Sequence, residues 1–278
     1  MGGFLETWRH IPSHLNPNLL EIGSFSLRWY SLMYLVAFAC TYGLILYRIR
    51  KEHYPYRTEQ IQDFMVWAIL GVILGARLGY VFFYNFGYYL QHPLEIIFPF
   101  DFSNGFRFIG ISGMSYHGGV IAVLLATIYF CRKQGIGFWR FADLVCPVIP
   151  LGYTFGRIGN FINGELYGRV TAAPWGMVFP LDPQGLPRHP SQLYEALFEG
   201  VVLFALLWLI RRRSPFDGAL FSFYLIGYGM VRFFIELLRE PDVHLGFILG
   251  SFSMGQLFCL AMIAAGAWIY AYRRRNVS

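Results

Sequence analysis

Charged and amide side chains interrupt several apolar stretches of this 278-residue chain at helical spacing. Arg232, Glu236 and Arg239 stand at i, i+4 and i+7, which predicts one shared helix face, and Arg157 and Asn160 stand at i and i+3 of another stretch. Guanidinium groups bind phosphate oxygens through paired N–H donors. Several arginines in excess over nearby acids therefore predict an anion site, with phosphate as the first candidate. The alternative is that these pairs only tie helices together.

His117 is the candidate base, because an imidazole titrates near neutral pH. The Gly118-Gly119 pair that follows it would permit the close approach of a lipid or a peptide backbone. The competing interpretation is a hydrogen-bonded histidine that only packs helices together. His117, His189 and Glu195 come from separate segments without metal-ligand spacing, and the sequence contains no glycine-rich loop of the nucleotide-binding type. We therefore expect no metal and no cofactor.

The composition indicates the kind of protein that holds these residues. Hydrophobic residues make up 56% of the chain and charged residues only 14%, with a mean hydropathy of +0.46. A soluble domain usually carries about 25% charged residues. A water-soluble enzyme, a disordered chain and a nucleic-acid binder are thereby excluded, despite the formal net charge of +6. The sequence predicts an all-α integral membrane protein.

Seven apolar stretches are long enough to cross a bilayer as helices. We expect a single polytopic membrane domain over residues 1–278, with two longer outer loops, 86–111 and 163–191, that mix aromatic, Gly and Pro residues. Such loops are candidates for small head elements at which a substrate enters or is selected. The predicted spans are 24–47, 61–85, 112–131, 141–162, 192–210, 218–238 and 252–272.

The basic residues set the orientation of these spans. Most of the 22 Lys and Arg residues lie in the loops after spans one, three and five and in the C-terminal tail. The positive-inside rule then places the C-terminus in the cytoplasm and the N-terminus outside. With this orientation, almost every polar or charged residue that is energetically costly to bury in a bilayer falls in the outer half of the membrane. The exceptions are Asp63 and Asp143, which we interpret as carboxylates stabilised by the dipole at the N-terminus of their own helices.

The segment GRIGNFINGELYG, residues 156–168, carries a more specific signal. It resembles the signature of the bacterial prolipoprotein diacylglyceryl transferase family, whose fixed positions are occupied here by Gly156, Arg157, Gly159, Asn160, Phe161, Asn163, Glu165 and Gly168. The similarity covers nearly the whole chain, through WYSLMY (29–34), NGFRFIGISGMSYHGG (104–119), RHPSQLYEA (188–196) and GYGMVRFFIELLREPD (227–242). Two departures are Tyr116, where phenylalanine is common, and the loop 169–187, which is shorter than in longer members of the family.

The resemblance implies a transferase of the bacterial inner membrane, with a periplasmic N-terminus and an active site toward the periplasmic leaflet. Such an enzyme transfers the sn-1,2-diacylglyceryl group of phosphatidylglycerol to the lipobox cysteine thiol of a preprolipoprotein. The transfer forms a thioether, releases glycerol phosphate and is the first step of lipoprotein maturation. The expected partners are therefore phosphatidylglycerol, the signal-peptide region of preprolipoproteins and the bilayer, and not nucleic acid.

The resemblance and the residue chemistry together assign roles within the predicted site. His117 would act as the base, while Arg157 and Arg232 would neutralise the phosphate as its charge grows. Glu236 is expected to orient its arginine neighbours, because a carboxylate between arginines is a weak base, and Glu195 and Glu199 are expected to pair with arginines across the bundle. Residues expected to bind substrate or shape the site are Tyr30, which is alternatively an interfacial aromatic, Asn160, Glu165, Gly168, Glu195, Glu236 and Arg239.

Two other functions fit part of the pattern. A transporter of an organic anion or a lipid would also use an outward cavity lined by arginines, but it predicts polar residues through the inner halves of the helices. The sequence has few polar residues there. An intramembrane hydrolase that uses Ser115 and His117 fits less well, since residues two apart do not face each other on a helix. Lipid transfer is favoured over both.

Overall fold

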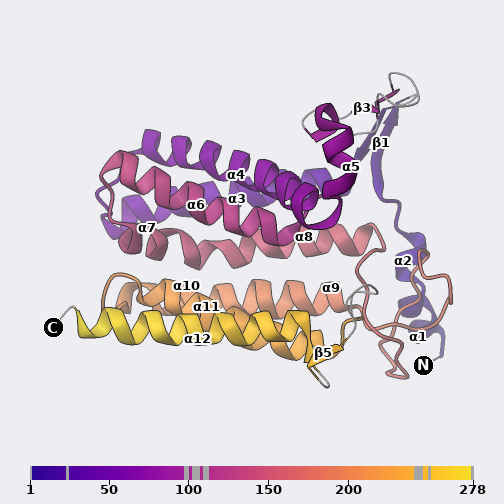
Figure 1. Ribbon diagram of the computed structural model, residues 1–278. Helices are drawn as coiled ribbons and strands as arrows, with labels where there is room; N and C mark the ends of the chain where they lie inside the picture. The colour runs from indigo at the N-terminus through magenta and orange to yellow at the C-terminus, as the bar shows by residue number, and fades with distance from the viewer. Residues whose placement is uncertain are drawn as a thin grey trace. The chain divides into compact units, whose positions relative to one another are not determined.

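Residues 2–22, 25–96, 100–101, 107–108, 113–240, 247–249 and 252–276 are described by the computed structural model of the chain (Figure 1). Helices dominate this part, and short two-stranded antiparallel sheets accompany them. The chain divides into two compact units: Met1–His53 with Ala142–Ser278, called unit 1, and Tyr54–Phe141, called unit 2. The single membrane domain stays a prediction.

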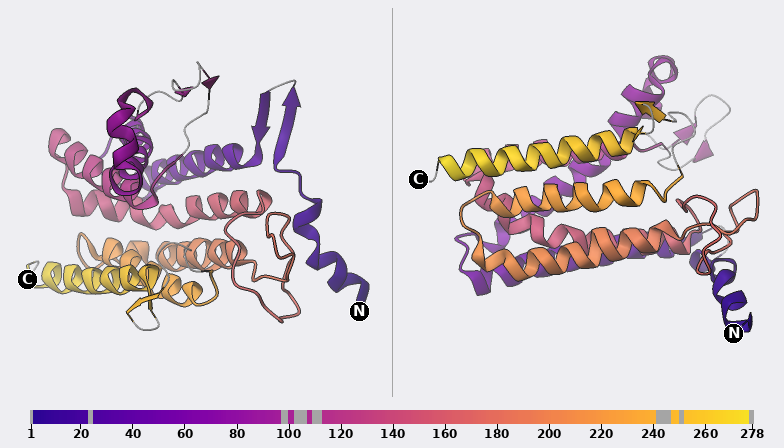
Figure 2. Two further views of the ribbon diagram at one scale, coloured as in Figure 1. Left: turned by 45° about the vertical axis from the view of Figure 1, so that its right-hand side comes forward. Right: turned by 90° about the horizontal axis from the view of Figure 1, so that it is seen from below.

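Unit 1 is built from long helices that run along one another. α3 (Trp29–Glu52) packs along α8 (Ile149–Ile162), and α11 (Ala219–Glu236) packs along α12 (Met254–Arg275), side by side in Figures 1 and 2. A third helical run passes from α9 (Ser191–Tyr194) through a π-helical segment, η3 (Glu195–Val202), into α10 (Leu203–Ile210). Shorter elements are α1 (Gly2–Arg9), α2 (Ile11–His14), η2 (Cys146–Val148), η4 (Arg211–Arg213) and the hairpins β1 (Asn18–Ile22) with β2 (Phe25–Arg28) and β5 (Phe247–Leu249) with β6 (Phe252–Ser253).

Unit 2 centres on two helices that approach each other closely, α4 (Thr58–Tyr84) and α6 (Tyr116–Gln134). A Cβ atom on Gly118 would overlap the carbonyl oxygen of Gly75 and crowd Gly79, and one on Gly75 would overlap Ala122. Small residues at such a crossing let helix backbones meet, as in other membrane proteins. The predicted use of Gly118 to admit a lipid or peptide backbone is therefore wrong, because α4 already occupies the space over it. The other elements are α5 (Phe86–Gln91), η1 (Pro93–Ile96), β3 (Phe100–Asp101), β4 (Arg107–Phe108) and the start of α7 (Phe138–Val145), which continues into unit 1.

Gly118→Ala is expected to destabilise unit 2 by about 1–3 kcal/mol, because the added methyl overpacks the α4–α6 contact. Thermal unfolding of the purified protein in detergent measures the effect. Gly43→Ala is the matched control, since a Cβ at that position of α3 meets nothing within 4 Å. Equal unfolding temperatures for the two variants would contradict the close approach of the helices.

Five helical segments of the described chain are long and apolar enough to span a bilayer. Their outer faces carry large apolar side chains that are exposed in the protein itself, such as Leu35, Phe83 and Leu209, as lipid-facing positions require. The structure therefore supports an integral membrane protein made of helices. The five segments are Trp29–Glu52, Thr58–Tyr84, Ser191–Arg213, Ala219–Glu236 and Met254–Arg275.

The first and fourth predicted spans differ from the structure for local reasons. α3 begins at Trp29 rather than at 24, because Phe25–Arg28 pair with β1 as strand β2. The predicted span 141–162 is not one continuous α-helix. It breaks into the end of α7, the 3-10 turn η2 and α8, with prolines near the start of the last two, Pro147 and Pro150. A proline lacks the N–H that an uninterrupted helix would need. The predicted third span, 112–131, corresponds to α6, and neither it nor α8 is among the five segments.

The interpretation of Asp63 and Asp143 as carboxylates at the start of their own helices is also corrected. The Asp143 carboxylate accepts hydrogen bonds from the backbone N–H groups of Gly218 (2.8 Å) and Phe221 (2.9 Å), so it stabilises the start of α11 instead. Arg48, fully buried, donates to the carbonyl oxygens of Asp143 and Leu144 and fixes this end of α7 to α3. Asp63 lies beyond the first turn of α4, where the acidic residue is Glu59, and the dipole effect fades within one turn.

The segment from Asn163 to Pro190 is folded and packs on unit 1, and its location outside the membrane stays a prediction. Arg188 binds Asp182 through two hydrogen bonds of 2.9 Å and also pairs with Glu240. Met177 and Phe179 pack against the end of α8 at Phe161 and against Trp8, Ile11 and Leu15 of the N-terminal elements. The Trp8 indole N–H donates to the carbonyl oxygen of Trp175 at 3.0 Å, which ties α1 to this segment.

Low pH is expected to destabilise the folded segment 163–190. Hydrogen bonds from Arg188 hold the pKa of Asp182 below its usual value, so the pair stabilises the fold above the ordinary aspartate pKa of about 3.9 and loses that contribution as the pH falls through the lowered pKa. Pepsin cleavage within residues 163–190, normalised to an unfolded reference peptide, should therefore accelerate only below about pH 4. Asp182→Asn should be cleaved quickly throughout, whereas Asp217→Asn at an exposed position should follow the wild type. A wild-type pH profile retained in Asp182→Asn would refute the role of the pair.

Candidate functional site

Arg157 occupies the middle of a polar cluster near the end of α8. Its Nε atom lies 2.7 Å from the Tyr153 hydroxyl and 2.7 Å from Oε2 of Glu195, and its Nη1 atom donates to Oδ1 of Asn160 at 3.1 Å. The guanidinium also stacks over the Tyr153 ring, 4.7 Å from its centroid. The predicted i, i+3 contact between Arg157 and Asn160 is therefore confirmed. Tyr153, one helical turn before Arg157, is a member of the site that the sequence prediction missed.

Arg232 on α11 binds three carboxylates. Its Nη1 atom lies 3.2 Å from Glu195 and 3.5 Å from Glu199, and its Nη2 atom lies 3.0 Å from Glu236. Oε2 of Glu195 contacts both Arg157 and Arg232 and so bridges the two guanidinium groups. The predicted pairing of Glu195, Glu199 and Glu236 with arginines is confirmed. We call Arg157, Arg232, Glu195, Glu199 and Glu236 the arginine–glutamate cluster.

The charge of this cluster differs from the prediction. The sequence predicted arginines in excess over acids, but two guanidinium groups here meet three carboxylates. Glu195 and Glu199 are fully buried, so their charges are compensated by the arginines rather than by water. Each arginine side chain is 13% exposed, and neither Nη2 of Arg157 nor Nε of Arg232 bonds to any described residue. The cluster is thus a paired framework that leaves N–H donors on both arginines available to a ligand.

A π-helical segment presents Glu195 and Glu199 to the arginines. Both residues belong to η3, where the widened helix packs against α8. Gly200 makes this contact possible, because a Cβ there would overlap the Thr154 side chain. The Thr154 hydroxyl lies within hydrogen-bond distance of the carbonyl oxygens of Pro150 (3.2 Å) and Ala196 (3.3 Å). Such widened turns occur frequently at functional sites, and the apolar periodicity of the sequence gave no signal of this one.

A second group of residues extends the cluster beyond the end of α8. Asn160 donates from Nδ2 to Oε1 of Glu165 at 2.8 Å, and Asn163 donates to the same oxygen at 3.3 Å. Tyr30 on α3 lies against Gly159, where a Cβ would approach its ring at 2.9 Å. The structure therefore brings Asn160 and Glu165 together with Arg157, and Tyr30 beside them.

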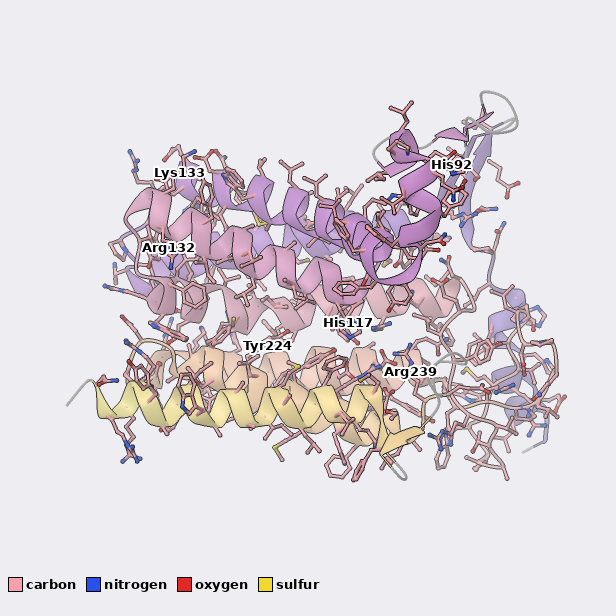
Figure 3. The ribbon with its side chains drawn as sticks, in the orientation of Figure 1. His92, His117, Arg132, Lys133, Tyr224 and Arg239 are labelled. Atoms are coloured by element: carbon pink, nitrogen blue, oxygen red, sulfur yellow. The ribbon has the colours of Figure 1, made fainter. Side chains whose placement is uncertain are left out.

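Arg239 does not share a helix face with Arg232 and Glu236, which corrects the predicted i, i+4, i+7 arrangement. α11 ends at Glu236, and the backbone beyond it pairs with Gly168 in an antiparallel bridge at Arg239 (labelled in Figure 3). The Arg239 carbonyl oxygen accepts a hydrogen bond from Nε of Arg169 at 2.8 Å. A Cβ on Gly168 would overlap the carbonyl oxygen of Leu238, so Gly168 lets these two backbones meet. Periodicity alone could not reveal where α11 ends.

Glu236 is held from a third helix as well. The Ser253 hydroxyl, at the N-cap of α12, donates to Oε1 of Glu236 at 3.2 Å, while Oε2 pairs with Arg232. Ser253 also caps its own helix by accepting from the backbone N–H of Gln256. Both carboxylate oxygens of Glu236 are therefore engaged, which fits the predicted orienting role better than that of a base.

His117 belongs to unit 2, in the first turn of α6, and its side chain is exposed there (Figure 3). Its ring lies edge-on to Tyr116, with centroids 5.8 Å apart. The Ser115 hydroxyl accepts from the Gly118 N–H at 3.3 Å and so caps the helix. Ser115 therefore has a structural task, and the role of His117 as a base stays a prediction. Among the described residues, no group of three or more His, Cys, Asp or Glu side chains is arranged to hold a metal ion.

Proteins of similar sequence identify the family of this chain. A model of the prolipoprotein diacylglyceryl transferase family matches residues 17–272. The chain is 51% identical over 274 residues to a phosphatidylglycerol--prolipoprotein diacylglyceryl transferase of Chlorobaculum tepidum, with 98% of this chain and 95% of the relative covered. Proteins of the same name from Bordetella parapertussis and Wolinella succinogenes are each 45% identical, with 95% of this chain and 97% and 96% of the relatives covered. The chain belongs to the prolipoprotein diacylglyceryl transferase family.

Proposed function

We propose that this protein transfers the sn-1,2-diacylglyceryl group of phosphatidylglycerol to the cysteine thiol of a preprolipoprotein, the first step of lipoprotein maturation. Relatives that carry the name of this activity match the chain over nearly its whole length. The observation within the chain that carries the proposal is the pair of arginines bridged by Glu195, each with an unused N–H donor. Such a pair suits a phosphate group.

The reaction is a displacement at a saturated carbon of glycerol. The thiol sulfur forms a bond to that carbon, the bond between the carbon and a phosphate oxygen breaks, and the electron pair leaves with glycerol phosphate. The phosphate gains charge as the bond breaks, so preorganised donors on Arg157 and Arg232 stabilise the transition state more than the bound lipid. Glu195 keeps the two guanidinium groups at a fixed separation, because its Oε2 atom contacts both.

The thiol must lose its proton in the same reaction. A free cysteine has a pKa of about 8.5, so a base raises the reactive fraction at neutral pH. His117 is the proposed base, because an imidazole exchanges a proton near neutral pH, whereas both carboxylate oxygens of Glu236 are already engaged. Tyr30, Gly168 and Arg239 complete the proposed substrate-binding residues, as the family signature and their positions around the end of α8 suggest.

The proposed setting is the inner membrane of a bacterium, with seven spans, the N-terminus in the periplasm and the C-terminus in the cytoplasm. The support is the distribution of basic residues along the sequence. α6 and the broken α7–η2–α8 run would supply the two spans beyond the five apolar segments. Reporter fusions at each loop test this arrangement, and a cytoplasmic N-terminus would contradict it.

The activity itself is tested with purified protein, phosphatidylglycerol vesicles and two synthetic peptides that differ only in cysteine or serine at the acceptor position. Mass spectrometry should show one added diacylglyceryl group on the cysteine peptide and none on the serine peptide. No mass gain on the cysteine peptide, or equal gain on both, would overturn the proposal.

A further inference from the structure

Besides Asn160, two amide side chains hold Glu165 in place. Asn163 donates from Nδ2 to Oε1 of Glu165, and Gln192 donates from Nε2 to its backbone carbonyl oxygen at 2.6 Å. The next residue, Leu166, has a left-handed backbone with φ of +59°, and the Ser191 hydroxyl donates to its carbonyl oxygen at 2.9 Å. A strained backbone fixed from several sides is a feature of preorganised sites.

The orientation of both amides follows from their partners. Carboxylate and carbonyl oxygens only accept hydrogen bonds, so Asn163 and Gln192 must each present the NH₂ end to Glu165. Their carbonyl oxygens, Oδ1 and Oε1, consequently turn elsewhere. Both oxygens are buried and have no hydrogen-bond donor in the described part of the chain, and the Gln192 side chain is fully buried. A buried acceptor without a donor destabilises the fold unless a ligand supplies the donor.

Glu165 differs from the other carboxylates of the site. Glu195, Glu199 and Glu236 all pair with arginine, whereas the hydrogen bonds of the Glu165 carboxylate come from the neutral amides of Asn160 and Asn163. Both amides use Oε1, which leaves Oε2 without a partner among the described residues. Three side-chain oxygens of Glu165 and of the amides that contact it thus lack a donor among the described residues: Oε2 of Glu165, Oδ1 of Asn163 and Oε1 of Gln192. We call them the acceptor group.

We propose that the acceptor group binds the hydroxyl groups of the glycerol headgroup of the lipid substrate. This inference rests on the proposed function and deepens it. Asn160 connects the two places, because it accepts from Arg157 and donates to Glu165. A phosphate bound at Arg157 would carry its three-carbon headgroup toward Glu165. That headgroup is a diol, so its two O–H donors match acceptors that the chain itself leaves unpaired.

Backbone N–H groups of the peptide substrate are the other source of donors. The link through Asn160 to the phosphate-binding arginine favours the lipid. The two sources predict different outcomes when the hydroxyls are removed from the headgroup. A lipid with the same phosphate and the same three carbons but no hydroxyls, phosphatidylpropanol, isolates the contribution of the diol.

The test compares phosphatidylglycerol with phosphatidylpropanol in the same vesicles, using the full-length protein and the cysteine peptide. A site that binds hydroxyl groups rejects an analogue without them, so kcat/KM of the wild type should fall about 100-fold or more with phosphatidylpropanol. Equal use of the two lipids by the wild type would overturn the inference. No transfer from either lipid would instead refute the proposed function, and the inference with it.

Glu165→Gln is the matched variant. The two asparagines keep an oxygen at the Oε1 position, so the new NH₂ group must take the Oε2 position and turns an acceptor into a donor. The ratio of kcat/KM for phosphatidylglycerol to that for phosphatidylpropanol should then fall to a few-fold. Activity on phosphatidylglycerol should be lost, whereas activity on phosphatidylpropanol should be unchanged. Glu6→Gln, at an exposed position of α1, should keep the wild-type preference. An unchanged lipid preference in Glu165→Gln, or a rise confined to the KM for the peptide, would contradict the inference.

Discussion

Arg157→Lys is expected to lower kcat for diacylglyceryl transfer by about 100- to 1,000-fold. Lysine keeps the positive charge, so the buried carboxylates of the arginine–glutamate cluster remain compensated and the fold is retained. A single ammonium cannot contact Tyr153, Glu195 and Asn160 and still present an N–H group to a phosphate, as the guanidinium does. The loss should therefore fall on kcat more than on KM, because the interaction strengthens in the transition state.

Initial rates at saturating lipid and peptide measure this effect. Arg213→Lys, the same substitution at an exposed position of the turn η4, is the control and should leave kcat unchanged. Wild-type turnover by Arg157→Lys would show that the planar set of N–H donors on the Arg157 guanidinium has no part in the reaction.

Removal of Arg232 should affect stability as strongly as activity. Arg232→Met leaves Glu195, Glu199 and Glu236 with one arginine between them, and two of these carboxylates are fully buried. Breaking buried ion pairs in this way costs about 3–5 kcal/mol. We expect a large fall in the unfolding temperature in detergent together with loss of transfer.

A second substitution separates the two effects. Glu199→Gln in the Arg232→Met background removes one uncompensated charge, so part of the lost stability should return while transfer stays absent. Recovery of activity in this double variant would show that Arg232 serves the fold alone. An unfolding temperature of Arg232→Met equal to that of the wild type would contradict the description of the cluster as a paired framework.

The helical character of the protein and several contacts of the candidate site follow from the sequence. Apolar stretches of sufficient length predict membrane helices, and five segments agree with that prediction. A spacing of four residues places Arg232 beside Glu236, and a spacing of three places Arg157 beside Asn160, because these contacts depend only on local helix geometry. The contacts of Glu195 with both arginines were expected only in general terms, since they join three separate helices.

Other features depend on where helices end or change form, which apolar periodicity does not encode. Arg239 was assigned to the face of Arg232 because the prediction extended α11 past its end at Glu236. The π-helical segment that carries Glu195 and Glu199 places Gly200 against Thr154 of another helix, a contact that forms only on folding. The net charge of the site could not be counted from the sequence either, because Glu199 and Glu195 meet Arg232 only after folding.

One isotope measurement tests the central claim, that sulfur displaces phosphate from a glycerol carbon of phosphatidylglycerol. The lipid is prepared with ¹⁸O in the ester oxygen between the diacylglyceryl carbon and phosphorus, and is incubated with the purified protein and the cysteine peptide. The thioether peptide should appear in equal amount to glycerol phosphate, with all of the ¹⁸O in glycerol phosphate. Formation of ¹⁸O-labelled diacylglycerol, or of glycerol phosphate without thioether, would contradict the claim.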